Sequence, residues 1–331
     1  MQPTYRLFGN ELSPYSVKVR SYFRFKGVPH EWIVRNAATE EEFQRYAKLP
    51  LIPLVVTPQG EALQDSTPII ETFERQRPEP SIVPADPRLA FLSALIEEYA
   101  DEWVNKPMFH YRWFYEADAL SAAERLAASL MPDADRAIAV EMIRNRMVPR
   151  LAFVGSSAQT REIIEHSFLR LLRHLEAHLR QRPYLFGQRP ALADFGLFGQ
   201  LYECSTDPTP GSLLRSQAPH VIEWIERMQA PQIEGEWEPF SVVAPALKPL
   251  LDEEIGRTFL PWTLANEAAL ASGQPEFELL LEGRPFRQAA QKYHAKSLAA
   301  LRKKYAALPP LPDLEELLER CGCQTALASA G

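Results

Sequence analysis

The chain has 331 residues and carries a formal net charge of −7, with a pI of about 5.6. This length predicts about two domains, and the scattered lysines and arginines argue against a nucleic-acid-binding surface. No apolar run reaches the roughly 18 residues of a membrane span. Residues 1–4 lack the basic start of a signal peptide, so we expect a cytoplasmic protein with no membrane partner.

The first 76 residues alternate strand and helix patterns, with turn signals such as Gly27 and Pro58-Gln59-Gly60 between them. Thr39 followed by Glu42 is the pattern of a capping box at a helix start. The expected elements are a strand (5–8), a helix (17–26), a strand (31–34), a helix (39–47), a hairpin (53–57 and 61–64) and a helix (66–76). The order βαβ and then ββα is that of the thioredoxin fold.

Three short motifs stand at the ends of these elements, and each is expected to supply a polar contact: Ser13-Pro14-Tyr15-Ser16, Leu51-Ile52-Pro53 and Asp65-Ser66. In this order they resemble the N-terminal domain of the glutathione transferase family. The resemblance covers the first ~80 residues closely and the helical remainder more loosely. The run that begins at Ser13 is similar to the first helix of serine-type and omega-type bacterial members. The resemblance implies that glutathione is the cosubstrate and that Ser13 is the catalytic, thiol-activating residue.

Ser13 would act on the glutathione sulfur as a hydrogen-bond donor. A free cysteine thiol has a pKa of about 8.5, and a donor beside a helix N-terminus raises the thiolate fraction at neutral pH. Ser13 also suits the simpler role of a helix cap, with Pro14 at the first helical position. Tyr15 and Ser16 are rival donors, and Tyr15 is also expected to contact glutathione.

The rest of glutathione is expected to be held by Ile52, Pro53, Asp65 and Ser66. A proline at the start of this third strand is usually cis in the fold, which would turn the polar groups of Ile52 toward a peptide; an ordinary trans proline is the alternative. Asp65-Ser66 begins a helix, where unpaired N–H groups favour an anion. Ser66 therefore suits the γ-glutamyl carboxylate and Asp65 its ammonium, although family members usually carry the longer Glu at this position.

Cysteine usage narrows the chemistry. The chain has three cysteines, Cys204, Cys321 and Cys323, and none lies in the first domain. Without a cysteine at position 13 we expect no mixed disulfide with glutathione, which disfavours thiol-reductase activity. Cys321-Gly322-Cys323 is too isolated for a four-ligand zinc site, so we expect free thiols and no metal.

The proline-rich segment at 77–87 marks a predicted domain boundary, because the pattern beyond it is almost wholly helical. We expect domains over 1–80 and 86–235 and a C-terminal helical extension over 236–331. Helices are predicted over 88–105, 122–130, 134–148, 160–182, 194–204, 219–229, 246–272, 285–307 and 313–321. Asp194 lies where the family begins its central buried helix, and we interpret it as structural.

Aromatic residues crowd the stretch 99–115, which in the family faces the active edge of the first domain. The resemblance therefore implies a substrate pocket lined by Trp103, His110 and Phe114. Pro107 is expected to break the helix there. A role in the core is the alternative, because aromatic stripes are commonly buried.

The extension after residue 236 is long for the family. Its apolar positions include Phe259, Trp262, Leu264, Phe286 and Tyr293. So many apolar side chains must be buried, either on the second domain or in a subunit interface. We expect docking on the second domain, anchored by Trp262 and Asn266.

These features predict a thioredoxin-like α/β domain followed by an all-α domain. The preferred function is a glutathione transferase that conjugates glutathione to a small electrophilic compound, apolar or aromatic. Detoxification and a homodimer are expectations from the resemblance. Two alternatives stay open: a non-catalytic binding or interaction protein with the same fold, and a glutathione-dependent isomerase or lyase that uses the same thiolate.

Overall fold

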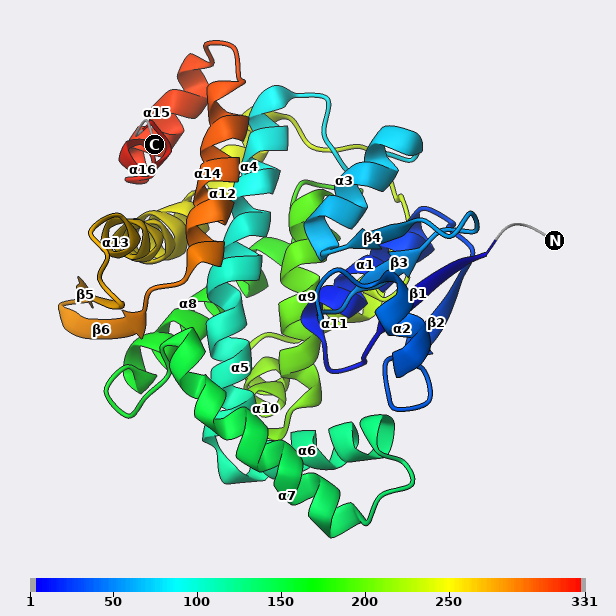
Figure 1. Ribbon diagram of the computed structural model, residues 1–331. Coiled ribbons are helices and arrows are strands. Elements are labelled where there is room, and N and C mark those ends of the chain that lie inside the picture. Colours follow the sequence, from blue (N-terminus) through cyan, green and yellow to red (C-terminus); the bar gives the residue numbers. More distant parts are fainter. Residues whose placement is uncertain (1–3, 329–331) are drawn as a thin grey trace.

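A computed structural model describes residues 4–328 of the chain (Figure 1). Its N-terminal part is a four-stranded sheet in the order β2-β1-β3-β4. The elements are β1 (Tyr5–Gly9), α1 (Pro14–Phe25), β2 (His30–Val34), α2 (Glu40–Tyr46), β3 (Leu54–Val56), β4 (Ala62–Gln64) and α3 (Ser66–Gln76). β1 and β2 are parallel, whereas β1 with β3 and β3 with β4 are antiparallel. This arrangement confirms the predicted thioredoxin-like fold.

Successive residues of each strand face opposite sides of the sheet. Leu7 and Val55 join the main core together with α1 and α3. Phe8 and Leu54 instead form a separate small cluster with Phe43 of α2. The sheet therefore carries α2 on one face and presents α1 and α3 to the helical part of the chain.

Thr39 does not cap α2 as predicted. Its hydroxyl donates to the carbonyl of Val34 (2.8 Å) and accepts from the backbone N–H of Asn36 (3.0 Å). The capping-box prediction is wrong because the hydroxyl closes the preceding turn, a local bond that competes with helix capping.

The helical part begins with a long rod made of α4, a π-helical segment η1 and α5 (Figure 1). The elements are α4 (Pro87–Tyr99), η1 (Ala100–Val104), α5 (Asn105–Phe114), α6 (Glu116–Leu130), α7 (Arg136–Met147), η2 (Val148–Val154), α8 (Arg161–Leu179), α9 (Leu192–Thr206), α10 (Pro208–Gln217) and α11 (Pro219–Met228). The predicted break at Pro107 is wrong. This proline lies in the first turn of α5 directly after the π-helical segment, and a first turn tolerates proline.

The central helix α9 is buried along most of its length. Asp194 holds the chain before it: one carboxylate oxygen accepts from the backbone N–H of Leu185 (3.0 Å) and from Trp224 Nε1 (3.1 Å), and the other accepts from the N–H of Ala191 (2.9 Å). Burial raises the pKa of Asp194 to about 7. These bonds agree with a structural role.

The C-terminal extension is not wholly helical. Its elements are α12 (Phe240–Leu250), the π-helical η3 (Leu251–Phe259), α13 (Leu260–Ala271), β5 (Glu276–Leu281), β6 (Arg284–Ala289), α14 (Lys292–Ala306), α15 (Pro312–Arg320) and α16 (Gln324–Ala328). The helix predicted from residue 285 is wrong at its start, because β5 and β6 form an antiparallel hairpin. Glu282 and Gly283 both have positive φ at its two-residue turn. Phe286 and Gln288 point inward from β6 and are buried.

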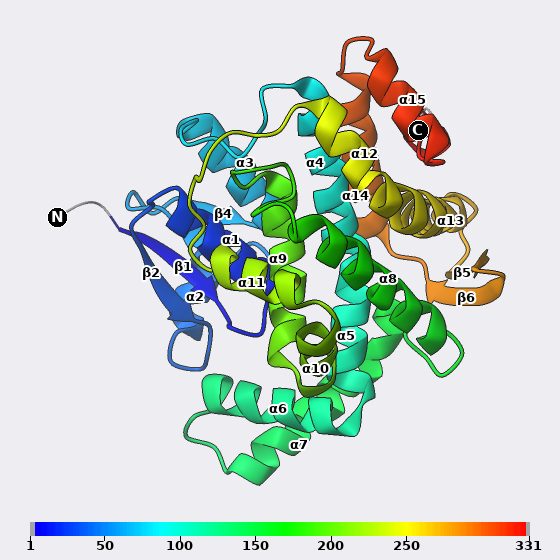
Figure 2. The ribbon, with the colours of Figure 1, turned by 180° about the vertical axis from the view of Figure 1, so that it is seen from behind.

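The extension docks on the chain's own second part, as expected, and α14 lies alongside α4 (Figures 1 and 2). Trp262 is fully buried, with its ring centroid 5.6 Å from that of Trp103, and its Nε1 donates to Gln288 Oε1 (3.0 Å). Asn266 exchanges two hydrogen bonds with the backbone of Gln291 (2.8 and 3.0 Å). These contacts join α13, the hairpin and α14 into one packed unit.

All three cysteines are free and buried. Within residues 4–328, His, Cys, Asp and Glu side chains form no group of three arranged to hold a metal ion. The helices in the same range include none with the length and apolar character needed to cross a bilayer.

Candidate functional site

Ser13 is the N-cap of α1, and its oxygen accepts two hydrogen bonds. The donors are the backbone N–H of Ser16 (3.3 Å) and the hydroxyl of Ser16 (2.9 Å). Both bonds use the Ser13 oxygen as acceptor, so its own hydroxyl hydrogen remains available as a donor. Capping the helix and donating to a ligand are therefore compatible for this residue.

The hydroxyl hydrogens of the two rival donors already have acceptors. Ser16 is fully buried and donates to Ser13. Tyr15 Oη donates to the backbone carbonyl of Asp101 in η1 (3.0 Å). Burial, together with the nearby Asp101 and Glu102 carboxylates, raises the pKa of Tyr15 well above its usual value. Among these three hydroxyls, only Ser13 has no acceptor within residues 4–328.

The second and third motifs lie side by side at the start of β3 and of α3. The Ile52–Pro53 peptide bond is cis, in agreement with the sequence-based expectation. The backbone N–H of Asp65 donates to the carbonyl of Pro53 (3.4 Å). Asp65 has φ = 78°, in the left-handed region that a non-glycine residue seldom occupies.

Ser66 is the first residue of α3, and its side chain is 1% exposed. Its hydroxyl oxygen has no hydrogen-bond partner within the described residues. Leaving a buried polar atom unpaired costs about 1–3 kcal/mol. A ligand atom that bonded this hydroxyl at the N-terminus of α3 would remove that cost, and an anion would also be favoured by the helix dipole.

Lys18 joins α1, α3 and the rod beneath these motifs. Its ammonium donates to Glu97 (2.6 Å), Asp101 (2.6 Å) and Thr67 Oγ1 (3.2 Å), and it is itself 1% exposed. Burial raises the pKa of Asp101 to about 7. At Glu97 burial acts in the same direction, but Lys18, Lys304 and Thr67 together outweigh it and hold the pKa of that carboxyl below its usual value. This network was not expected from the sequence. Its one local signal is that Glu97 and Asp101 are four residues apart on one helix face.

Gly199 of α9 lets the N-terminus of α1 sit directly on the central helix. A Cβ atom at this position would lie 2.5 Å from the carbonyl oxygen of Pro14. Because no real Cβ contact is so short, glycine is required for this approach. The segment that carries Ser13 is therefore positioned by backbone contact with the helical part.

The structure corrects two of the three predicted pocket residues. Trp103 and His110 have no exposed surface, which contradicts a role in lining an open pocket. Trp103 Nε1 donates to Ser167 Oγ (2.8 Å). The ring nitrogens of His110 bond Ser156 Oγ (2.7 Å) and Glu165 (3.2 Å), and burial lowers the pKa of His110. Both were misjudged because α8 and the extension cover the rod on the side that they face.

Phe109 and Phe114 lie closer to the surface than Trp103 and His110. Phe114 is partly buried, and its ring centroid is 4.7 Å from that of His110. Phe109 of α5 and Leu12, the residue before Ser13, are also partly buried, and both pack on the cluster around Trp113. The guanidinium of Arg112 donates to the carbonyl of Leu12 (3.1 Å), which ties α5 to this loop. Leu12 and Phe109 thus provide apolar surface beside the start of α1.

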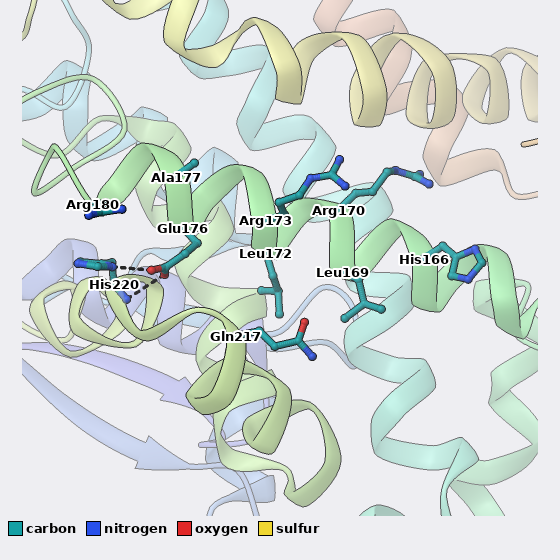
Figure 3. A pocket seen from close by; sticks show the side chains of 10 residues that line it. All are labelled: His166, Leu169, Arg170, Leu172, Arg173, Glu176, Ala177, Arg180, Gln217 and His220. Carbon is teal, nitrogen blue, oxygen red and sulfur yellow. Dashed lines mark hydrogen bonds and ion pairs between the residues drawn. The ribbon is translucent and has the colours of Figure 1, made fainter.

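A groove of about 710 Å³ lies on the outer face of α8, between that helix and the ends of α10 and α11 (Figure 3). Its basic side chains are largely paired: His220 bonds Glu176 (2.5 Å), and Arg173 bonds Glu253 (2.8 Å). No element of the sheet domain lines it. The groove is therefore separate from the three motifs.

Comparison with known protein families agrees with this geometry. Residues 7–81 match the profile "Glutathione S-transferase, N-terminal domain", and residues 158–227 match "Glutathione S-transferase, C-terminal domain". The chain belongs to the glutathione S-transferase family. Both matched segments precede the docked unit that begins at α12.

Individual relatives are distant. The isoprene-epoxide–glutathione S-transferase of Rhodococcus sp. (strain AD45) is 23% identical over 226 residues, which is 66% of this chain and 92% of the relative. A glutathione S-transferase from Methylobacterium radiotolerans, solved with glutathione sulfonate, is 22% identical with a TM-score of 0.45, over 69% of this chain and 91% of the other. The beta-etherase LigF of Sphingobium sp. strain SYK-6 is 19% identical with a TM-score of 0.47, and the match covers 69% of this chain and 96% of LigF.

Proposed function

We propose that this glutathione S-transferase conjugates glutathione to a small electrophilic compound, apolar or aromatic. The observation that carries the proposal is the Ser13 hydroxyl, whose hydrogen is available at the N-terminus of α1 while Tyr15 and Ser16 are engaged elsewhere. Glutathione would be held by Ile52, Pro53, Asp65 and Ser66. Tyr15 would fix α1 against the rod. The resemblance further supports a cytoplasmic homodimer with a detoxifying role. Light scattering would measure the mass of the protein in solution and so test the homodimer.

In the proposed reaction the bound thiol loses its proton to solvent, and the Ser13 O–H and the positive end of α1 stabilise the thiolate. The sulfur then attacks an electrophilic carbon held against Leu12 and Phe109. A carbon–sulfur bond forms as a leaving group departs with its electron pair or as an epoxide ring opens and its oxygen takes a proton. The name of the Rhodococcus relative supports an epoxide as one class to test.

Calorimetric titration with reduced glutathione tests the function directly. Binding with proton release, measured in buffers of different ionisation heat, is expected for an enzyme that forms the thiolate. Mass spectrometry of glutathione incubated with a panel of epoxides and aryl halides would then identify a conjugate. No binding would favour an interaction protein, and binding with isomerised or cleaved product would favour the isomerase or lyase alternative.

Replacing Ser13 with alanine is expected to raise the pKa of the bound glutathione thiol by about one to two pH units, because a hydrogen bond to a charged group contributes about 1.5–3 kcal/mol. Affinity should change little. The measurement is ultraviolet thiolate absorbance against pH. Ser13→Thr keeps the hydroxyl and serves as the control; a shift in Tyr15→Phe but not in Ser13→Ala would assign the donor to Tyr15.

Replacing Ser66 with alanine is expected to weaken glutathione binding by about 1.5–3 kcal/mol, because the variant loses a hydroxyl bond to an anionic carboxylate. Calorimetry measures the dissociation constant. Ser216→Ala on the exposed face of α10 is the matched control, since that hydroxyl bonds its own helix. An unchanged dissociation constant in folded Ser66→Ala would rule out this anchor.

A further inference from the structure

Helix α14 of the extension lies against the rod close to the predicted glutathione site (Figure 1). At its N-terminal end His294 Nδ1 bonds the carboxylate of Glu102, and Ser297 Oγ donates to the other oxygen of that carboxylate (3.2 Å). Further along, Lys304 forms an ion pair with Glu71 of α3 (2.8 Å). The helix is thus fixed to η1 and to α3 at once.

These anchors bring Tyr293, in the first turn of α14, to the third motif. Its hydroxyl donates to Asp65 Oδ2 at 3.4 Å, across 228 positions of the sequence. The side chain is 56% exposed, so the expectation that Tyr293 is buried with the other apolar positions of the extension is wrong. Burial of the hydroxyl end and the carboxylates of Asp65, Glu102 and Asp101 raise the pKa of Tyr293.

The side chains around this hydroxyl carry more negative charge than their cations neutralise. Lys18 is shared by Glu97 and Asp101, and His294 pairs with Glu102. Asp65 and Glu98 form no ion pair within residues 4–328, and burial raises the pKa of Asp65 more than Lys18 lowers it. Burial and the neighbouring carboxylates raise the pKa of Glu98 well above its usual value.

Three buried oxygen atoms in this region have no hydrogen-bond partner within the described chain: Ser66 Oγ, Glu98 Oε1 and Asp101 Oδ1. Ser66 adjoins Asp65, and Glu98 and Asp101 are three residues apart on one face of the rod. Oxygens of an ionised carboxylate accept hydrogen bonds and cannot donate them. A primary ammonium beside Asp65 would supply three N–H donors and a positive charge.

We infer that α14 forms one wall of the ammonium-binding end of the glutathione site, and that Tyr293 is a specificity-determining residue that selects ligands with a free α-amino group. The phenol oxygen of Tyr293 can accept a hydrogen bond from the ammonium while its O–H group still donates to Asp65. Tyr293 therefore orients the Asp65 carboxylate and contacts the ligand. The inference rests on the proposed function, since it names the part of glutathione that the extension recognises.

The test compares reduced glutathione with its analogue that lacks the α-amino group, γ-glutaryl-cysteinylglycine, by calorimetry on the full chain. The unmodified protein should bind glutathione more tightly than the analogue. Tyr293→Phe should reduce that preference by about tenfold to a hundredfold, in line with loss of one hydrogen bond to a charged group. Tyr305→Phe is the matched control, because Tyr305 lies on the same helix but packs on Phe91 (5.2 Å).

A preference that is unchanged in Tyr293→Phe, with glutathione binding intact, would overturn the inference and leave the proposed function standing. Failure of the unmodified chain to bind glutathione would overturn both. Because Tyr293 is more than half exposed, the variant should keep the melting temperature of the parent, and circular dichroism would verify this. An equal loss of preference in Tyr305→Phe would show a general effect of α14 and also refute the specific role.

Discussion

Replacing Lys18 with methionine is expected to lower the free energy of unfolding by about 3–5 kcal/mol, the range for breaking a buried ion pair from one side. The variant keeps the apolar stem but leaves Glu97 and Asp101 buried without their shared cation, and it removes the bond to Thr67. Urea unfolding at pH 7 measures the loss. Lys48→Met, at an exposed position, is the matched control and should change stability by less than about 0.5 kcal/mol.

The loss in Lys18→Met should shrink as the pH falls from 7 to 5. Without the cation, the folded-state pKa values of both carboxyls lie above their unfolded values of about 4. The folded state then binds more protons than the unfolded state within that window, so stability falls as pH rises through it. Asp101 already has a pKa of about 7 with Lys18 present. A loss that grew on acidification would show that the carboxylates are not the cause.

Replacing Trp262 with alanine is expected to cost about 3–5 kcal/mol, because a fully buried large ring leaves a cavity. The change also removes the Nε1–H that donates to Gln288. It removes as well the ring whose centroid lies 3.9 Å from Nζ of the buried Lys106. Burial lowers the pKa of Lys106 to about 7, which means that burial destabilises its charged form. Losing the Trp262 ring would remove one of the groups that stabilise this charge. Chemical denaturation at fixed pH is the measurement.

Two variants calibrate the Trp262 result. Leu280→Ala lies in the same extension at a site that is 69% exposed, and it should change stability by less than about 0.5 kcal/mol. Trp262→Phe keeps most of the apolar ring and should fall between the parent and the alanine variant. If Trp262→Ala cost no more than Leu280→Ala, the extension would not be docked through this side chain in solution.

The N-terminal half of the site could be predicted from sequence because its signals are local. The apolar positions of α1, the turn at Gly27 and the proline before β3 act over a few residues of neighbouring chain. The same holds for Asp65 and Ser66, whose place at a helix start is marked by their own residue types. An N-terminal thioredoxin-like fold followed from these patterns before any long-range contact was known.

The hairpin β5–β6 and helix α10 show where local signals mislead. Pro285 is typical of a first helical turn, yet it lies in a strand whose Phe286 and Gln288 are buried, with Gln288 donating to the carbonyl of Phe153 (2.6 Å). Pro208 and Gly211 favour a loop, yet α10 forms with Pro208 at its first position, where proline is tolerated. In the hairpin, burial against distant elements outweighs local preference, whereas in α10 the proline suits the helix start that it occupies.

Local residue patterns predicted the order of the sheet elements along the chain, the three motifs and the resemblance to the family. Only the folded chain shows that Trp103 and His110 are interior, that Lys18 pairs with two carboxylates, and that Tyr293 donates to Asp65. The difference lies in the distance along the chain between the residues involved. Helix periodicity, capping and turns involve residues a few positions apart, whereas burial and ion pairing depend on segments that approach each other only after the whole chain has packed.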